Sequence, residues 1–106
     1  MPKPPYAIVY DSALLTHLDA IDRKDHSAIR RAIETMLTHE PENESRNRKP
    51  LVRPSSLGVA WELRCGKDNR FRVFYRTETL RREVRVLAIG VKLGNRLSVG
   101  GKEFDL

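Results

Sequence analysis

Residues 70–76 read Arg-Phe-Arg-Val-Phe-Tyr-Arg, and this alternation of cationic and apolar side chains restricts the fold more than any other feature of the chain. Successive side chains of a β-strand point to opposite faces of a sheet, so the alternation predicts a strand with one buried and one open face. Phe71, Val73 and Tyr75 form the apolar set, and the arginines share the other face with Phe74. These arginines form either a solvated surface or a surface that binds an anion.

Residues 59–65 alternate in the same way, and residues 66–69, Gly-Lys-Asp-Asn, have the composition of a hairpin turn. Pairing the two strands places on one core face the side chains Trp61, Leu63, Cys65, Phe71, Val73 and Tyr75. The opposite face then holds Glu62 and Arg64 beside Arg70, Arg72 and Arg76. Like charges across a sheet are unfavourable, so Glu62 or a bound phosphate is expected between them. Alternatively, Glu62 simply pairs with one arginine on a solvated sheet.

The other segments complete a prediction of the fold. Strands are expected at residues 6–10, 83–92 and 96–99, and helices at residues 12–23 and from Asp25 to near His39. The strand at 83–92 is apolar enough to be central and covered on both faces. We therefore predict a single α+β domain over residues 1–106: a small twisted, mostly antiparallel sheet of about four strands, with an N-terminal helical hairpin packed on one face.

The charge is distributed unevenly along the chain. Residues 1–45 carry five Lys and Arg against eight Asp and Glu, which is −3, whereas residues 46–106 carry fifteen against six, which is +9. Such asymmetry is typical of a polyanion-binding face, above all for nucleic acid, although a basic surface can also simply keep a protein soluble. Prolines interrupt any periodic pattern in residues 40–58, so we predict a long surface loop there. Its basic residues are Arg46, Arg48, Lys49 and Arg53.

Several classes of site are not expected. A single cysteine, Cys65, cannot form an internal disulfide, fits a reducing cytoplasm, and lies on the core side of its strand as a small buried hydrophobe. The three histidines lack the spacing of metal ligands, so we expect neither metal nor cofactor. The longest apolar run, residues 86–91, is too short to span a membrane, and the first residues do not resemble a signal peptide.

The order of these segments resembles the RelE/ParE superfamily of bacterial toxins from type II toxin–antitoxin systems. The resemblance covers most of the chain, and its strings are Lys49-Pro50-Leu51, Trp61-Glu62-Leu63-Arg64, Phe71-Arg72-Val73-Phe74-Tyr75 and residues 86–92. RelE-like members cleave mRNA in the ribosomal decoding site without a metal, by attack of a ribose 2′-hydroxyl on the adjacent phosphate. ParE-like members share the fold but inhibit DNA gyrase. Both are neutralised by a cognate antitoxin, so the resemblance implies a toxin–antitoxin hetero-oligomer.

The resemblance also implies roles for individual residues. Arg72 matches the arginine that stabilises the scissile phosphate, and Arg64 matches a basic residue that contacts RNA and assists proton transfer. Lys92 matches a basic position at the end of the last core strand, with Arg96 as a nearby substitute. From the charge of the predicted loop and of the arginine-bearing strand, rather than from the resemblance, the expected RNA contacts are Arg46, Arg48, Lys49, Arg53, Arg70 and Arg76.

Two positions depart from the superfamily's pattern. Glu62 stands where ribosome-dependent RelE has a lysine, and Ser98 aligns with the C-terminal catalytic aromatic. Arginine does not lose its proton in the working range, so the base for the 2′-hydroxyl is expected to be Glu62, or one of Lys49, Lys67 and Lys92 if its surroundings favour the neutral amine.

The favoured interpretation is a cytoplasmic toxin, a metal-independent endoribonuclease that cleaves mRNA at the ribosome. A ParE-like gyrase inhibitor, or a homologue that binds proteins but has lost catalysis, is the alternative that Glu62 and Ser98 favour. A basic nucleic-acid-binding domain without a toxin role is the third. Trp61 is predicted to belong to the core. Phe74, an aromatic on the arginine side, is predicted to be covered by the C-terminal tail or an antitoxin, with stacking on RNA as the alternative.

Overall fold

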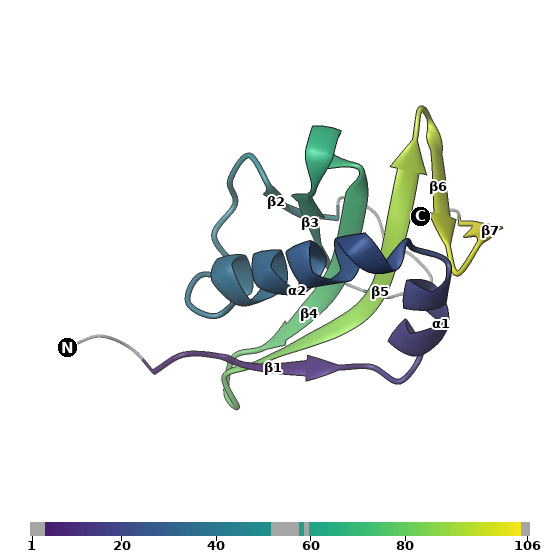
Figure 1. The fold of residues 1–106 in the computed structure, drawn as a ribbon. Helices are drawn as coiled ribbons and strands as arrows, with labels where there is room; N and C mark the ends of the chain where they lie inside the picture. The colour runs from purple at the N-terminus through teal and green to yellow at the C-terminus, as the bar shows by residue number, and fades with distance from the viewer. Residues whose placement is uncertain (1–3, 52–57, 59, 105–106) are drawn as a thin grey trace.

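The computed structural model describes residues 4–51, 58 and 60–104, which form one sheet with two helices on one of its faces (Figure 1). The strands are β1 Ala7–Tyr10, β2 Arg48–Pro50, β3 Trp61–Cys65, β4 Phe71–Glu78, β5 Glu83–Leu93, β6 Arg96–Val99 and β7 Lys102–Glu103. The helices are α1 Leu14–Asp19, α2 Arg23–Leu37 and a short 3-10 turn, η1 Lys67–Asn69. The predicted α+β class is confirmed, but the described residues form seven strands rather than about four.

β5 is the central strand of the sheet. One of its edges pairs antiparallel with β4, and the other is shared by two strands: β1 runs parallel beside residues 83–86, and β6 runs antiparallel beside residues 90–93. The order across the sheet is β2-β3-β4-β5-β6-β7, with β1 on the same edge of β5 as β6. Every pairing except β1 with β5 is antiparallel, as predicted.

The two helices cover the face of the sheet that we call the helix face, and α2 crosses it (Figure 1). Ile29, Ile33 and Leu37 of α2 are buried in the main core, together with Leu14 of α1. α2 begins earlier than predicted, because Asp22 has the extended backbone of an N-cap residue (ψ 133°). None of the described helices has the length and apolar character needed to cross a membrane.

The predicted hairpin register is confirmed. Trp61 pairs with Tyr75, Leu63 with Val73 and Cys65 with Phe71, and these side chains belong to or pack against the main core. The Trp61 and Tyr75 rings are stacked, with their centroids 6.3 Å apart, so Trp61 is a core residue as predicted. The intervening residues of both strands therefore project from the opposite face, which we call the arginine face.

A second, small core lies on the arginine face. Phe74 is fully buried there with Ala88 and Val99, beneath the partly buried side chains Leu51, Leu97 and Phe104. Phe104 follows β7, its N–H donates to the carbonyl of Leu97 (2.8 Å), and its ring centroid lies 6.4 Å from that of Phe74. The C-terminal tail therefore covers Phe74, as predicted.

A β-bulge makes this second core possible. Phe74 pairs with Ala88 but Tyr75 pairs with Val86, so Leu87 has no partner on β4. The extra residue reverses the alternation of β5. Val86 consequently faces the helices, whereas the small Ala88 lies opposite Phe74, where there is room for the ring.

The predicted loop at residues 40–58 contains a strand. β2 pairs with β3 through Arg48 and Leu63, Lys49 and Glu62, and Pro50 and Trp61. A proline is tolerated because β2 is an edge strand, where one side needs no hydrogen-bonded neighbour. The loop prediction was therefore wrong for residues 48–50. Residues 52–57 and 59 lie outside the described part of the chain.

His17 of α1 accepts a backbone hydrogen bond from β5 at a position where no neighbouring strand that the structure describes accepts one. Between the end of β1 and the start of β6, the N–H of Ile89 has no strand partner on that edge, and it donates instead to Nδ1 of His17 (3.3 Å). This contact requires the neutral imidazole, because a protonated Nδ1 cannot accept. Burial lowers the pKa of His17 from 6.5, with the Asp11 carboxylate acting in the opposite direction.

We expect this contact to make stability depend on pH. A histidine whose pKa is lowered by folding binds fewer protons in the folded state, so its contribution is complete above pH 6.5 and is lost as the pH falls below that value. His17→Asn keeps an acceptor oxygen but does not titrate. Urea unfolding between pH 7.5 and 5 should therefore show a shallower decline for His17→Asn than for the wild-type chain. Identical slopes would contradict the assignment, since His26 and His39 are common to both.

Candidate functional site

Two arginines and one carboxylate form a cluster on the arginine face. Arg64 and Arg72 lie directly opposite each other in the β3–β4 ladder. Both donate to the same oxygen, Oε1 of Glu62, from Nε of Arg64 at 2.7 Å and from Nη1 of Arg72 at 3.3 Å. The Glu62 side chain is only 9% exposed, so this is a partly buried cluster and not a solvated surface pair. Glu62 supplies the negative charge that the paired strands require.

Arg72 is held in one orientation by two elements. Nε of Arg72 donates to the carbonyl of Asn69 (3.0 Å), and Nη1 donates to Glu62. Asn69 belongs to the η1 turn, where Asp68 and Asn69 have positive φ angles of 56° and 52°, a conformation that asparagine and aspartate adopt more readily than other side chains. Two of the five N–H groups of the guanidinium are thus used, and the others remain for a ligand.

Arg72 and Lys92 together line two adjoining pockets. The first, of about 560 Å³, is basic, because Lys67 and Arg70 of the hairpin turn also line it. The second, of about 240 Å³, is bounded by Glu62 and by Phe104 of the tail. Lys92 reaches this position because its N–H donates to the carbonyl of Arg70 (2.7 Å), which continues the β4–β5 ladder past the turn. Arg72, which is expected to stabilise the scissile phosphate, therefore lines the same two pockets as Lys92, another member of the predicted catalytic set.

The predicted basic residues of residues 46–53 separate onto different surfaces. Lys49 pairs with Glu62 and so projects from the arginine face beside the cluster. Arg48 projects from the other face and is buried: Nε donates to the carbonyl of Asn43 (2.8 Å) and Nη1 to that of Met36 (3.1 Å). The geometry gives Arg48 the role of anchoring the loop to α2. Arg46 is exposed, and Arg53 lies outside the described residues.

Arg70, Arg76 and Arg96 also differ in position. Arg70 lies in the turn before β4, exposed, with its guanidinium 5.0 Å from the centroid of the Phe71 ring. Arg76 is exposed on the arginine face. Arg96 precedes Leu97, which packs in the second core, so strand alternation places Arg96 on the helix face, away from Arg72.

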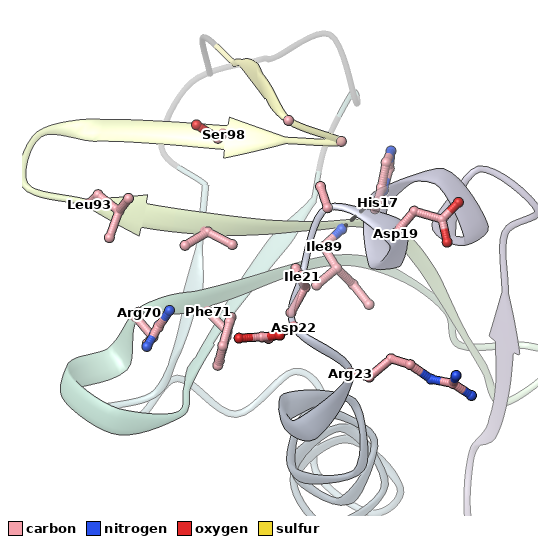
Figure 2. Close-up of a pocket in the computed structure, with 14 residues that line it drawn as sticks. His17, Asp19, Ile21, Asp22, Arg23, Arg70, Phe71, Ile89, Leu93 and Ser98 are labelled. Atoms are coloured by element: carbon pink, nitrogen blue, oxygen red, sulfur yellow. Dashed lines mark hydrogen bonds between the residues drawn. The ribbon is translucent and has the colours of Figure 1, made fainter.

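Ser98 lies on the helix face as well. It lines a pocket of about 750 Å³ with His17 and Phe71 (Figure 2). Strand alternation places this pocket and the Glu62 cluster on opposite faces of the sheet. The aromatic side chain beside Arg72 and Lys92 is instead Phe104. Sequence reasoning did not assign Phe104 to the site, although a signal was available: Phe74 needed an apolar cover, and Phe104 is the one aromatic residue after Tyr75.

Cys65 is unsuited to nucleophilic chemistry. Burial raises the pKa of its thiol to about 11, with the Arg72 charge acting in the opposite direction. A thiol with such a pKa is almost entirely protonated near neutral pH. Among the described residues, no group of three or more His, Cys, Asp and Glu side chains is placed to hold a metal ion.

Comparison with known proteins identifies the fold. One chain of the RelBE2 toxin–antitoxin complex from Mycobacterium tuberculosis superimposes with a TM-score of 0.67, covering 83% of this chain and 99% of that chain at 23% sequence identity. The RelE-like fold predicted from the sequence is thereby confirmed. No protein-family model matches the sequence, and no curated protein matches it.

Proposed function

We propose that this protein is the toxin of a type II toxin–antitoxin module and a metal-independent endoribonuclease that cleaves mRNA at the ribosome. The observation that carries the proposal is the fixed Arg72 guanidinium, oriented by Glu62 and Asn69 in a cleft that it shares with Lys92. The likeness to a chain of a toxin–antitoxin complex supports the toxin role and an antitoxin partner.

The cluster suits phosphate chemistry. The planar guanidinium of Arg72 matches the oxygens of a phosphate, and Lys92 adds a second positive charge, so the two can stabilise the charge that develops on the pentacoordinate phosphorus. An ionised Glu62 can accept the proton of the 2′-hydroxyl as that oxygen bonds to phosphorus. Lys92 can donate a proton to the departing 5′ oxygen, which leaves a cyclic phosphate and a 5′-hydroxyl.

A ParE-like role is the second candidate, because Ser98 lies on the opposite face from Arg72 and Glu62 occupies a position that is basic in RelE. Such a protein would use the basic surface to bind DNA gyrase rather than to cleave RNA.

One experiment separates the two candidates. The chain is expressed from a tightly regulated promoter while growth and the integrity of several mRNAs are followed, and purified protein is added to a gyrase supercoiling assay. We expect growth arrest with new 5′-hydroxyl ends within coding sequences and normal supercoiling. Inhibited supercoiling with intact mRNA would support the ParE-like role, and no effect in either assay would leave the toxin role without support.

A further inference from the structure

A second pair of arginines projects from the arginine face. β4 alternates without interruption from Phe71 onward, so Arg76 lies on the same face as Arg72. The ladder pairs Arg76 directly with Arg85 of β5. Val84 and Val86, on either side of Arg85, are buried in the main core, and Arg85 therefore points away from the helices as well.

The two arginine pairs differ in how their charge is balanced. Arg64 and Arg72 share the carboxylate of Glu62. Arg76 and Arg85, in contrast, make no side-chain hydrogen bond or ion pair with any residue of the chain that the structure describes. Like charges directly opposite each other in a sheet are destabilising. The Arg76–Arg85 pair therefore retains an electrostatic repulsion that Glu62 offsets at the Arg64–Arg72 pair.

The surroundings leave both guanidinium groups available. On its other side Arg85 pairs with Val9 of β1. Two positions further along the β4–β5 hairpin, Glu78 and Glu83 pair with each other on the same face. Their negative charge lowers the positive potential around Arg76 and Arg85, but neither glutamate forms an ion pair with either arginine. Arg81 in the exposed turn adds a positive charge.

We propose that Arg76 and Arg85 form a second phosphate-binding site, which holds the sugar–phosphate backbone of a single-stranded RNA whose scissile phosphate lies at Arg72. Two guanidinium groups side by side can donate to several oxygens of one phosphate. Arg76 lies four positions beyond Arg72 along the strand, a distance of about 13 Å at roughly 3.3 Å per residue, which a few nucleotides can span. The second core lies between the two sites, and the partly exposed Phe104 offers a ring on which a base can stack.

The choice of RNA rests on the proposed function, whereas phosphate binding by this pair does not. A substrate held at two points along one face is fixed in direction as well as in position, because a strand bound only at Arg72 can rotate about that contact. The second site therefore favours an extended single strand over a mononucleotide. It also explains why the arginine face stays basic beyond the Glu62 cluster.

The first test measures binding of a 2′-O-methyl oligoribonucleotide, which cannot be cleaved, by fluorescence anisotropy over a range of salt concentrations. Arg76→Gln/Arg85→Gln removes the contacts to one phosphate, so the slope of log affinity against log salt should become shallower by about 0.7. Lys24→Gln/Arg30→Gln removes the same charge from exposed positions of α2 on the helix face and is the matched control. An unchanged slope in the first variant, or the same change in both, would overturn the proposal.

The second test separates the phosphate site from the RNA function. Thermal unfolding is followed with increasing pyrophosphate at constant ionic strength. We expect pyrophosphate to raise the Tm of the wild-type chain more than that of Arg76→Gln/Arg85→Gln. In its absence the double variant should be at least as stable as wild type, because repulsion is relieved. If the wild-type chain binds no RNA but shows this difference, the phosphate site stands and the RNA function fails. Equal shifts in Tm would overturn the site itself.

Discussion

Arg72→Ala is expected to abolish growth arrest and to lower the rate of mRNA cleavage by about 10²–10³, the loss typical of removing one donor that stabilises a transition state. The side chain is only 11% exposed, and both Glu62 and Asn69 orient it toward the cleft. Arg72→Lys should recover little activity, because an ammonium group keeps the charge but lacks the planar set of donors that can contact Glu62, Asn69 and phosphate in one orientation. Cleavage is measured by primer extension on an mRNA under ribosomal translation.

The control for this prediction is Lys24→Ala, which removes an exposed cation from α2 on the opposite face of the sheet. This variant should arrest growth like wild type. Circular dichroism of purified Arg72→Ala would show that loss of activity is not loss of fold. Full toxicity of a folded Arg72→Ala chain would remove Arg72 from the reaction and with it the main support for an endoribonuclease.

The β3–β4 hairpin was predictable because the residues that specify it lie close together in the sequence. Each strand alternates over at least five residues, and a short turn joins them, so one register satisfies both apolar faces. Glu62, Arg64 and Arg72 followed from that register as a group on one face. The cover over Phe74 was predictable for a related reason: burying an aromatic side chain away from water is favourable, so a cover by another part of the chain or by a partner was expected.

Features that depend on contacts distant in sequence were not predictable. β2 and β7 have three and two residues, respectively. Strands this short show no recognisable alternation in the sequence, and β2 depends on its pairing with β3. Without β2, Arg48 and Lys49 look equivalent, although the strand places one beneath α2 and the other beside Glu62. The bulge at Leu87 likewise leaves no local signal, because residues 86–91 are apolar throughout.

The same limit on prediction from sequence applies to the second pair of arginines, Arg76 and Arg85. Arg76 was predicted to contact RNA from its place in the alternating strand. Arg85 was not, because its role depends on the β4–β5 register, which the bulge shifts by one residue. The sequence therefore predicts that a face is basic, but only the strand register shows which charges lie next to one another.

Glu62→Ala should cause the largest loss of stability among substitutions in the cluster, lowering the free energy of unfolding by about 3 kcal/mol, because removing one partner of a buried ion pair leaves the other charge uncompensated. Arg64 and Arg72 would then face each other without an acceptor between them. Urea denaturation measures the loss. Glu34→Ala, which breaks the exposed pair of α2 with Arg30, is the control and should change stability far less.

A second substitution tests whether the uncompensated charge is the cause. Arg72→Met in the Glu62→Ala background removes the buried charge and retains apolar volume, so it should restore much of the lost stability but no cleavage. If the double variant is as unstable as the sum of its single changes, Glu62 stabilises the sheet by packing and not by balancing the arginines. Recovery of stability would show that Glu62 stabilises the fold by balancing the buried charge of Arg72.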